Sequence, residues 1–517
     1  MSVHHFHQTI LFESNTRIFC KTHNRKIGKE LALIYLSLPE VQASDCLWTM
    51  GIWQPSPKSI QIAREHEGLR HEFQNCLHDL QNEDIIGSPY SVFDYVPNKD
   101  ICESWEALAE FKNTLNQFGK KLILDFVPNH LSVDSIWIDK FPDAFLELNH
   151  PQTNNDYARS SSELKLNIKS NSLAKNPNPE NSIIIPKNYF QHSSGKIFAH
   201  GRDPYFDGWT DTVQFDFSSE VCKDLHNEIL SNISNYCDGL RCDMAMLPQA
   251  DIFEKTHGRK GLPYWEVVIK NIRNKNPNFI FIAEVYWQRE YELQQLGFDF
   301  TYDKELYDRL KSKNANELTG HLTAELNFQN KSLRFLENHD EPRAALTFGN
   351  NAMFDFSLLC FLPGGILIYE NQMNGFKKRI PVQLGRMPDE PIDMGILNFY
   401  KRVFQRLSFR RNKNLLFMNA RVSIYENTSS HYVAIGLRYE DNQSEILIYN
   451  PNSYPISGRI HLDPSFYSPF ISKDSFTFMD VMDDKLYRQD STEVHREGIY
   501  FNLKENKSHW MVPLRKE

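Results

Sequence analysis

Short apolar runs recur from the start of the chain to Tyr369, and longer polar or amphipathic stretches separate them. Such runs are typical of buried strands. Two of the stretches between them, Ser104–Phe118 and Tyr264–Ile272, place apolar residues at the three-to-four spacing of a helix. Strands that alternate with helices predict a parallel barrel or a doubly wound sheet. The eight runs are Arg17–Cys20, Cys46–Trp53, Lys121–Val127, Gly239–Ala245, Phe279–Tyr286, Phe298–Tyr302, Leu333–Leu336 and Gly364–Tyr369.

Two regions depart from this alternation. Residues 131–206 are polar and turn-rich, with KSNSLAKNPNPENS near their centre. That is too long for an ordinary strand-to-helix loop, so it predicts a subdomain inserted after the third strand. From about Asn412 the chain alternates apolar and polar residues between turn signals, which predicts antiparallel strands. The expected domains are therefore a barrel over 1–130 and 207–408, the insertion over 131–206, and a C-terminal β-sandwich over 409–517.

Bulk properties exclude several classes of protein. The formal net charge is -9, which gives no electrostatic case for binding nucleic acid or an anionic membrane. The longest apolar run is broken by Pro363, Gly364 and Gly365 and is too short to span a bilayer. The N-terminal residues do not resemble a signal peptide, so we expect a cytoplasmic protein. The eight cysteines are scattered without a CxxC pair, which predicts free, buried thiols.

Four of the apolar runs end in polar or charged side chains. The carboxyl ends of parallel strands in one barrel converge on the face where active sites lie. A lone carboxylate buried in a strand is costly unless it is paired or hydrogen-bonded, so packing alone does not explain the repeated pattern. The side chains are Asp125, Asn129 and His130 in LILDFVPNH; Arg241 and Asp243 in GLRCDMA; Glu284 in FIFIAEVYW; and Glu337, Asn338, His339, Asp340 and Arg343 in LRFLENHDEPR.

The local chemistry of these residues suits acid, base and nucleophile roles. Arg241 and Asp243 leave the same face of a strand, and a guanidinium favours the ionised carboxylate that a nucleophile needs. Glu284 follows an apolar stretch, which raises a carboxyl pKa and suits a general acid. We expect Arg241 to spend its charge on Asp243 and to do little at Glu284. Alternatively, Arg241 and Asp243 form a structural ion pair and Glu284 is a structural carboxylate.

Together these motifs resemble a known family. DFVPNH, GLRCDMA, FIAEVYW and FLENHD are similar, in order and spacing, to the four signature regions of the α-amylase superfamily. WTMGIWQPSP resembles its second barrel strand, GSPYSVFDY its loop with a sugar-stacking tyrosine, and FLPGGILIYENQ its eighth strand. The resemblance covers about residues 12–400. It implies a (β/α)₈ TIM barrel with a subdomain inserted after strand 3 and a C-terminal antiparallel β domain.

The resemblance also implies a role for each matching residue. Three carboxylates would carry the chemistry: Asp243 as nucleophile, Glu284 as general acid/base and Asp340 as the group that stabilises the transition state. Four side chains would hold the sugar at the cleavage point, namely Tyr90, His130, Arg241 and His339. Asp125 matches a carboxylate that is usually structural. Retaining glycosidases need one carboxylate as nucleophile and a second as acid, then base, at about 5 Å.

The sequence departs from the family pattern in places that bear on substrate. Met244–Gln249 stands where many starch-cleaving members have Lys-His, so we expect a short α-glucoside or maltooligosaccharide substrate. After strand eight, Glu370–Gln372 replaces the usual Gly-Gln-Glu, and the following segment, 374–393, marks a poorly characterised bacterial branch. Asn129 matches a family calcium ligand, which implies a structural Ca²⁺. The chemistry itself requires no cofactor.

Several functions remain open at this stage. The leading hypothesis is a retaining hydrolase of α-linked glucosides, but a transglycosylase, isomerase or phosphorylase would use the same triad. A non-catalytic carbohydrate-binding barrel is disfavoured because all three acids are present. A metal-dependent hydrolase using His130, His339 and Asp340 would need an HxH pair near strand one. The cluster at 4–7 precedes that strand in an end that we expect to fray. The sequence leaves the oligomeric state open.

Overall fold

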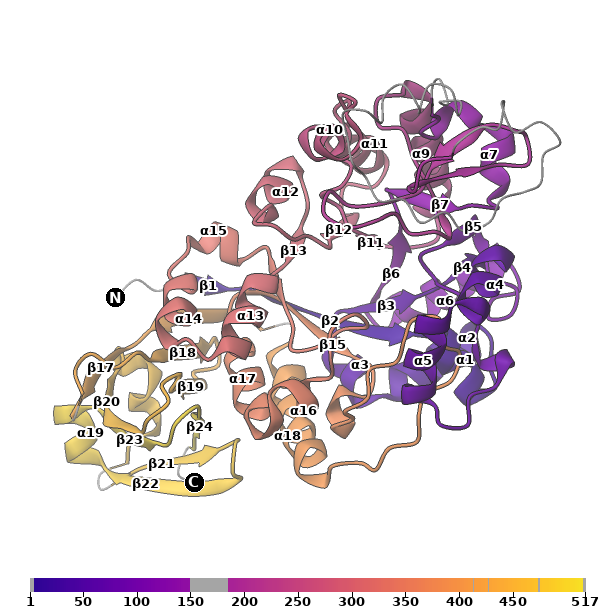
Figure 1. Ribbon diagram of the computed structural model, residues 1–517. Helices are drawn as coiled ribbons and strands as arrows, with labels where there is room; N and C mark the ends of the chain where they lie inside the picture. Colours follow the sequence, from indigo (N-terminus) through magenta and orange to yellow (C-terminus); the bar gives the residue numbers. More distant parts are fainter. Residues whose placement is uncertain (1–3, 149–184, 412, 426, 473–474, 515–517) are drawn as a thin grey trace.

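Eight parallel strands close into a barrel in the computed structural model, which describes residues 4–148, 185–411, 413–425, 427–472 and 475–514 (Figure 1). The last barrel strand pairs with the first over six residues, Gly364 to Tyr369 against Gln8 to Glu13. This closure decides between the two expected architectures in favour of the barrel. The strands are β2 (Gln8–Asn15), β3 (Cys46–Met50), β6 (Lys121–Phe126), β11 (Gly239–Cys242), β12 (Ile280–Ala283), β13 (Phe300–Tyr302), β14 (Ser332–Arg334) and β15 (Gly364–Tyr369).

Helices surround the barrel strands and bury their apolar faces against them. The two helices predicted from periodicity are confirmed as α6 and α11, and Ser104 caps the first by accepting from the Ala107 amide. The main helices are α1 (Thr16–His23), α2 (Lys29–Ser37), α4 (Pro57–Glu65), α5 (Glu67–Cys76), α6 (Trp105–Gln117), α9 (Glu220–Ile233), α10 (Ala250–His257), α11 (Trp265–Lys275), α12 (Glu290–Leu296), α13 (Lys304–Ser312), α14 (Ala315–His321), α17 (Ala352–Leu359) and α18 (Met394–Arg410). Shorter ones are α3 (Pro39–Ala43), α15 (Leu326–Gln329) and α16 (Ala344–Thr347).

The first barrel strand lies earlier in the chain than predicted. Arg17–Cys20 belongs to α1, not to a strand, and the strand is β2, QTILFESN. Asn15 ends that strand and caps the helix, because its side chain accepts from the Ile18 amide. Ile18, Phe19 and Cys20 are buried as residues of α1. An apolar run this short does not distinguish a buried helix from a buried strand.

The segment inserted after β6 begins and ends in one pair of antiparallel strands. β7 (His130–Ser132) pairs antiparallel with β10 (Thr212–Gln214). Between them lie α7 (Ile136–Lys140) and the hairpin of β8 (Tyr189–Gln191) and β9 (Ile197–Ala199). The stretch KSNSLAKNPNPENS lies outside the described residues, and the boundaries of the inserted subdomain stay a prediction.

The C-terminal region folds into two antiparallel sheets, as expected. Apolar side chains from both sheets, among them Ile446, Ile460 and Phe501, share one core. The seven-stranded sheet runs β1-β16-β18-β19-β24-β21-β22, and the three-stranded sheet runs β17-β20-β23. The strands are β16 (Leu415–Asn419), β17 (Arg421–Ile424), β18 (Val433–Tyr439), β19 (Ser444–Tyr449), β20 (Ile456–His461), β21 (Ser475–Asp480), β22 (Lys485–Asp490), β23 (Ile499–Leu503) and β24 (Ser508–Pro513), with α19 (Ser491–Glu497) between β22 and β23.

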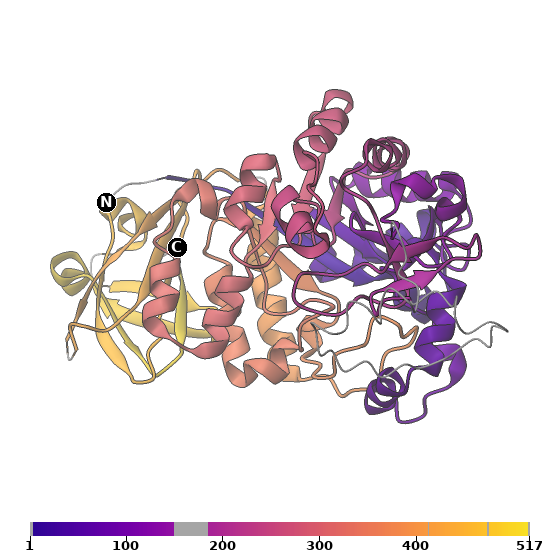
Figure 2. The same ribbon diagram turned by 45° about the horizontal axis from the view of Figure 1, so that its top comes forward.

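The N-terminal residues form part of this C-terminal sheet. β1 (His4–Phe6) pairs antiparallel with β16, with His4 opposite Phe417. In Figures 1 and 2 the indigo strand that begins the described chain lies at the end of the molecule that carries the gold and yellow C-terminal strands. The expectation that this end frays is therefore wrong for His4 to Phe6, since an edge strand holds it.

Two sequence-based expectations on bulk character can be compared with the structure. All eight cysteines are buried and free, as predicted. Within the described ranges, none of the helices has the length and apolar character needed to cross a membrane.

Candidate active site

Asp243 and Glu284 directly follow neighbouring barrel strands. Asp243 comes after β11 and Glu284 after β12, and backbone bonds continue the ladder past the strand ends. The Asp243 amide donates to the Phe126 carbonyl at 2.8 Å, and the Glu284 amide donates to the Cys242 carbonyl at 3.0 Å. Because the backbone is held on both sides, the two carboxylates start from fixed positions at the carboxyl end of the barrel.

Arg241 lies between these two carboxylates. Its Nη1 is 2.8 Å from Asp243 Oδ1, and its Nη2 is 2.7 Å from Glu284 Oε2. The guanidinium is fully buried and lies over the rings of Trp48, Tyr90 and Tyr302 at 5.1, 5.3 and 5.7 Å. The expectation that Arg241 does little at Glu284 is therefore wrong. Nη1 donates a hydrogen bond to Asp243, whereas Nη2 contacts Glu284 as an ion pair without a hydrogen bond, and the spacing along one strand did not reveal this second contact.

Glu284 keeps a raised pKa in spite of this neighbour. Burial raises the pKa of Glu284 to about 7; the Arg241 charge opposes the shift, and the charges of Asp243 and Asp340 add to it. Tyr286 Oη and the Met244 amide each donate to the Glu284 carboxyl at 2.8 Å. Burial also raises the pKa of Asp243, against the opposing effect of Arg241. A carboxyl that titrates near 7 can give and take a proton at neutral pH.

Asp340 and His339 face the pair from the segment after β14. His339 Nε2 lies 3.0 Å from Asp340 Oδ2 and 2.7 Å from Tyr90 Oη, and the His339 and Tyr90 rings stack at 5.3 Å. Burial raises the pKa of Asp340, but the charge and hydrogen bond of His339, together with the charges of Arg241 and Arg379, outweigh this and lower the pKa to about 2. The Asp340 side chain is 43% exposed, against 10% for Asp243 and 4% for Glu284. Asp340 is thus ionised and accessible at the mouth of the barrel.

His130 is the first residue of β7, at the start of the segment inserted after β6. It is buried, its ring packs at 5.1 Å from Trp209, and burial lowers its pKa to about 4. A Cβ on Gly201 would come within 2.8 Å of the His130 Cβ, so only glycine lets the returning chain approach so closely. His130 is therefore neutral and fixed under the loop that precedes β10.

Asn129 is engaged by another amide side chain. Gln214 Nε2 donates to Asn129 Oδ1 at 3.0 Å, and Asn129 Nδ2 donates to Gln214 Oε1 at 3.2 Å. Among the described residues, no group of three or more His, Cys, Asp or Glu side chains is placed to hold a metal ion. The Asn129 amide is thus taken up by Gln214, and the calcium expectation stays a prediction.

Two further carboxylates at barrel strand ends, Asp125 in β6 and Glu337 after β14, are held by hydrogen bonds within the protein. Asp125 accepts from the Trp48 indole at 3.1 Å and the Gly51 amide at 3.0 Å, which agrees with a supporting role. Glu337 accepts from Arg343 Nη1 at 2.7 Å and from the Ala344 amide at 2.5 Å. Glu337 is 1% exposed and fully engaged by this turn.

Sequence reasoning missed one carboxylate next to the site. Glu13 lies near the carboxyl end of β2, is fully buried, and places Oε1 at 2.5 Å from His339 Nδ1. The signal was the same as at the other strands, because TILFE is an apolar run that ends in an acid. Glu13 escaped notice because the first strand was placed at Arg17–Cys20. Tyr286 and Tyr302, which donate to or contact the charged centre, carried no comparable signal.

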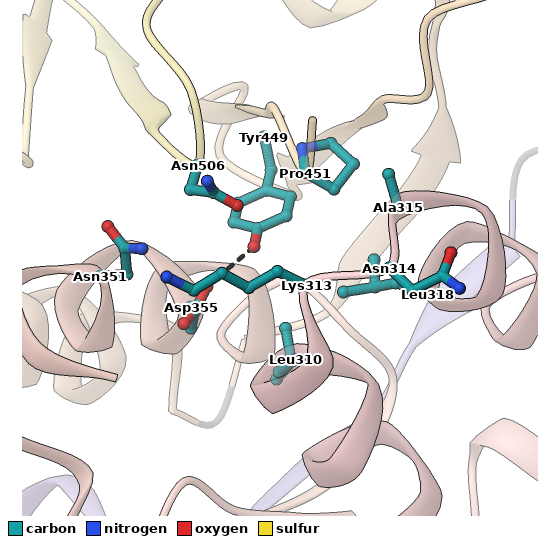
Figure 3. A pocket seen from close by; sticks show the side chains of 10 residues that line it. All are labelled: Leu310, Lys313, Asn314, Ala315, Leu318, Asn351, Asp355, Tyr449, Pro451 and Asn506. Atoms are coloured by element: carbon teal, nitrogen blue, oxygen red, sulfur yellow. Dashed lines mark hydrogen bonds between the residues drawn. The ribbon is translucent and has the colours of Figure 1, made fainter. Parts of the chain in front are cut away.

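Two cavities elsewhere in the described chain lie outside this charged centre. A cleft of about 940 Å³ runs beside α1, and its lining includes Arg17, Ile27, Pro55 and Asn98. A second cavity of only about 10 Å³ lies where the barrel helices meet the C-terminal sheet, and Figure 3 shows Tyr449 bonded to Asp355 in it. That space holds at most about one water, so it is no sugar site.

A closed (β/α)₈ barrel with buried acids at its strand ends is the architecture of a large class of enzymes. A family model described as "Alpha amylase, catalytic domain" matches residues 79–390, which is more than half of the 517 residues. The chain belongs to the α-amylase family, whose members are glycoside hydrolases and transglycosylases. No curated protein matches the chain in sequence.

Solved structures share this fold at low sequence identity. A maltogenic α-amylase from Thermotoga neapolitana is 17% identical, with a TM-score of 0.61 and coverage of 98% of this chain and 99% of that one. An α-amylase from Geobacillus thermoleovorans, solved with acarbose, is 15% identical, with a TM-score of 0.59 and coverage of 98% of both chains. A debranching enzyme from Nostoc punctiforme is 13% identical, with a TM-score of 0.57 and the same coverage. Likeness at this level concerns the fold alone.

Proposed function

We propose that this protein is a retaining glycosidase that acts on α-linked glucosides by double displacement. One observation carries the proposal: a single buried guanidinium, Arg241, lies within 2.8 Å of Asp243 and within 2.7 Å of Glu284. Two carboxylates bound to one guanidinium are close neighbours. Retaining enzymes need such proximity, because no water has to fit between nucleophile and sugar.

In the first step Asp243 attacks the anomeric carbon while Glu284 protonates the leaving oxygen. The glycosidic bond breaks, and a glycosyl ester forms on Asp243. In the second step the Glu284 carboxylate takes a proton from the acceptor, and the acceptor oxygen displaces Asp243. Asp340, ionised beside His339, stabilises the positive charge that develops on the sugar in both steps.

The electrostatics support this division of labour. Glu284, with a pKa of about 7, is protonated in a large fraction of molecules at neutral pH. Asp340, with a pKa of about 2, is ionised throughout the working range. Environments that push neighbouring carboxyl pKa values apart are how one site runs acid and base chemistry together. The proposed chemistry uses no cofactor.

We propose a short α-glucoside or maltooligosaccharide as the substrate. Lys-His is absent after the nucleophile, and Met246 and Leu247 of the replacing stretch are buried in the core rather than facing sugar. Arg289 donates to Gln249 Oε1 at the end of this stretch at 3.3 Å and pairs with Asp251 at 2.7 Å. These features favour a site with few contacts beyond the cleavage point.

A substrate screen tests the proposal. Sucrose, trehalose, maltose, maltooligosaccharides, glycogen and starch are incubated with the purified protein, with and without acceptor sugars or phosphate. We expect short α-glucosides to be turned over fastest. Starch cleaved far faster than every short sugar would contradict the substrate assignment, and transfer products exceeding free glucose would make the enzyme a transferase. Inactivity on all of these α-glucosides would contradict the function itself.

A further inference from the structure

A carboxylate from the first barrel strand lies behind His339. Glu13 Oε1 is 2.5 Å from His339 Nδ1, and both side chains are at most 1% exposed. The opposite ring nitrogen, Nε2, faces Asp340 Oδ2 at 3.0 Å. The imidazole therefore has an acid on each nitrogen, one deep in the barrel wall and one at the substrate opening.

Further described groups lie against His339 or are influenced by its charge. Tyr90 Oη lies 2.7 Å from Nε2, and Trp48 packs edge-on against the ring at 5.5 Å. Asp125, on β6, senses the His339 charge, which lowers its pKa against the larger effect of burial. The Glu13 charge in turn raises the pKa of Glu337, where burial is the larger cause. Burial lowers the pKa of His339, but the charges of Asp340 and Glu13 and their hydrogen bonds to the ring together hold it well above its usual value.

The protonation state of His339 decides what it can do for Asp340. With hydrogens on both nitrogens, His339 donates from Nδ1 to Glu13 and from Nε2 to Asp340. If His339 were neutral with its hydrogen on Nδ1, the Nε2 lone pair would face an Asp340 oxygen, and the two acceptors would repel. A charge behind Nδ1 is therefore what keeps the Nε2 hydrogen in place.

We propose that Glu13 is a positioning residue that holds His339 as an imidazolium, so that His339 donates through Nε2 to Asp340 at the catalytic centre. The proposal rests on the proposed function for its kinetic consequence but not for its structural content. Glu13 does not touch substrate. It acts through His339, and this gives a role to a fully buried acid near the carboxyl end of β2.

The test compares Glu13→Gln and Glu13→Asp with wild type. Glutamine keeps the size and can accept a hydrogen bond but removes the charge, whereas aspartate keeps the charge on a shorter side chain. Glu370→Gln is the matched control. Glu370 follows the neighbouring strand β15 and accepts from Ser14 Oγ and the Asn15 amide at 2.7 and 3.0 Å, without contacting His339.

The first readout is kinetic and follows kcat and KM against pH. In Glu13→Gln we expect kcat at neutral pH to fall about 10- to 100-fold with a smaller change in KM, since each unit by which the His339 pKa drops below the assay pH reduces its protonated fraction about tenfold. The ratio to wild type should recover as pH is lowered and His339 regains its proton. Glu13→Asp should restore part of the activity. Glu370→Gln should leave the shape of the profile unchanged.

The second readout is the titration of His339 itself, followed by NMR of ¹⁵N-histidine-labelled protein and assigned with His339→Gln. It needs no substrate, so it decides the proposal even if no α-glucoside is turned over. We expect His339 to stay protonated in wild type and Glu370→Gln and to titrate at lower pH in Glu13→Gln. An unchanged His339 titration in folded Glu13→Gln, or an equal loss of kcat at every pH, would overturn the proposal. If Glu13→Gln does not fold, Glu13→Asp decides by the same titration.

Discussion

Asp243 is the nucleophile of the proposed mechanism. It is held by Arg241 Nη1 at 2.8 Å, and asparagine can occupy the same space without the nucleophilic charge. We expect Asp243→Asn to reduce kcat by about 10⁴-fold or more while the fold stays intact, because members of such a triad act as a unit. Rates on the best substrate of the screen, with the thermal midpoint as control, measure this. Near-normal turnover would show that Asp243 is not the nucleophile.

Glu284 should set the alkaline side of the pH profile. Its pKa is raised, so activity should fall as the pH passes above about 7 and the acid loses its proton. The acidic side should fall as Asp243 gains a proton, and the raised pKa of Asp243 moves that limb to higher pH. A profile measured from pH 4 to 9 gives both limbs.

The matching variant separates acid catalysis from general damage. Glu284→Gln should still react in the first step with an activated substrate, because a good leaving group needs little protonation. Burst kinetics with activated and unactivated glucosides distinguish the two cases. Equal loss on both at that step would assign the acid to another group. Glu337 is a poor candidate for the acid, since its carboxylate already accepts hydrogen bonds from Arg343 and the Ala344 amide.

At the scale of elements, α17 meets β19 through a buried acid (Figure 3). Asp355 is 3% exposed and accepts from Tyr449 Oη at 2.8 Å, and burial raises its pKa from 3.8 to about 7. A carboxyl with a raised pKa in the folded state contributes most below its unfolded value, and that stability is lost as the pH rises toward 7. The expected loss is on the order of 4 kcal/mol.

Asp355→Asn should remove this pH dependence, because the amide keeps an acceptor for Tyr449 and never ionises. Thermal midpoints from pH 4 to 8 measure it. We expect the thermal midpoint of the variant to rise relative to that of wild type as the pH increases to about 7. Above pH 7 the difference should stay constant. A constant difference across the whole range would mean that Asp355 does not titrate in that window.

At the scale of the whole molecule, one acid ties the barrel to the C-terminal sheet. Glu445 on β19 is fully buried and faces Arg406 and Arg410 of α18, and the Trp510 indole donates to it at 2.7 Å. Burial opposes ionisation, but the two arginines lower the pKa of Glu445 to about 2. Its stabilising effect is therefore present above the unfolded value and lost as pH falls toward 2.

We expect Glu445→Gln to destabilise the protein by about 3 to 5 kcal/mol at neutral pH, because it leaves buried arginine charge unpaired. The difference from wild type should shrink in acid. Chemical denaturation at pH 7 and pH 3 measures this. The pH profile of kcat should be unaffected, since Glu445 lies in the C-terminal sheet. A variant as stable as wild type at pH 7 would contradict the assignment of this contact.

The sequence predicted the fold and the site to different extents. Seven of the eight predicted runs coincide with barrel strands, because parallel strands buried on both faces leave a strong local signal. Arg17–Cys20 failed because burial by helix packing and burial in a sheet select the same apolar residues over four positions. The misplaced strand also hid Glu13, although its pattern matched that of the other acids.

By itself, the sequence determined which side chains end the strands, and hence that Asp243, Glu284 and His339 lie at one end of a barrel. Only the tertiary structure decided how their charges are shared. Arg241 bridges two acids rather than one, and Glu13 lies behind His339 although 326 positions separate them. Strand ends are set by local burial, which each segment of sequence records. Contacts across a closed barrel depend on which strands become neighbours, and no single segment records that.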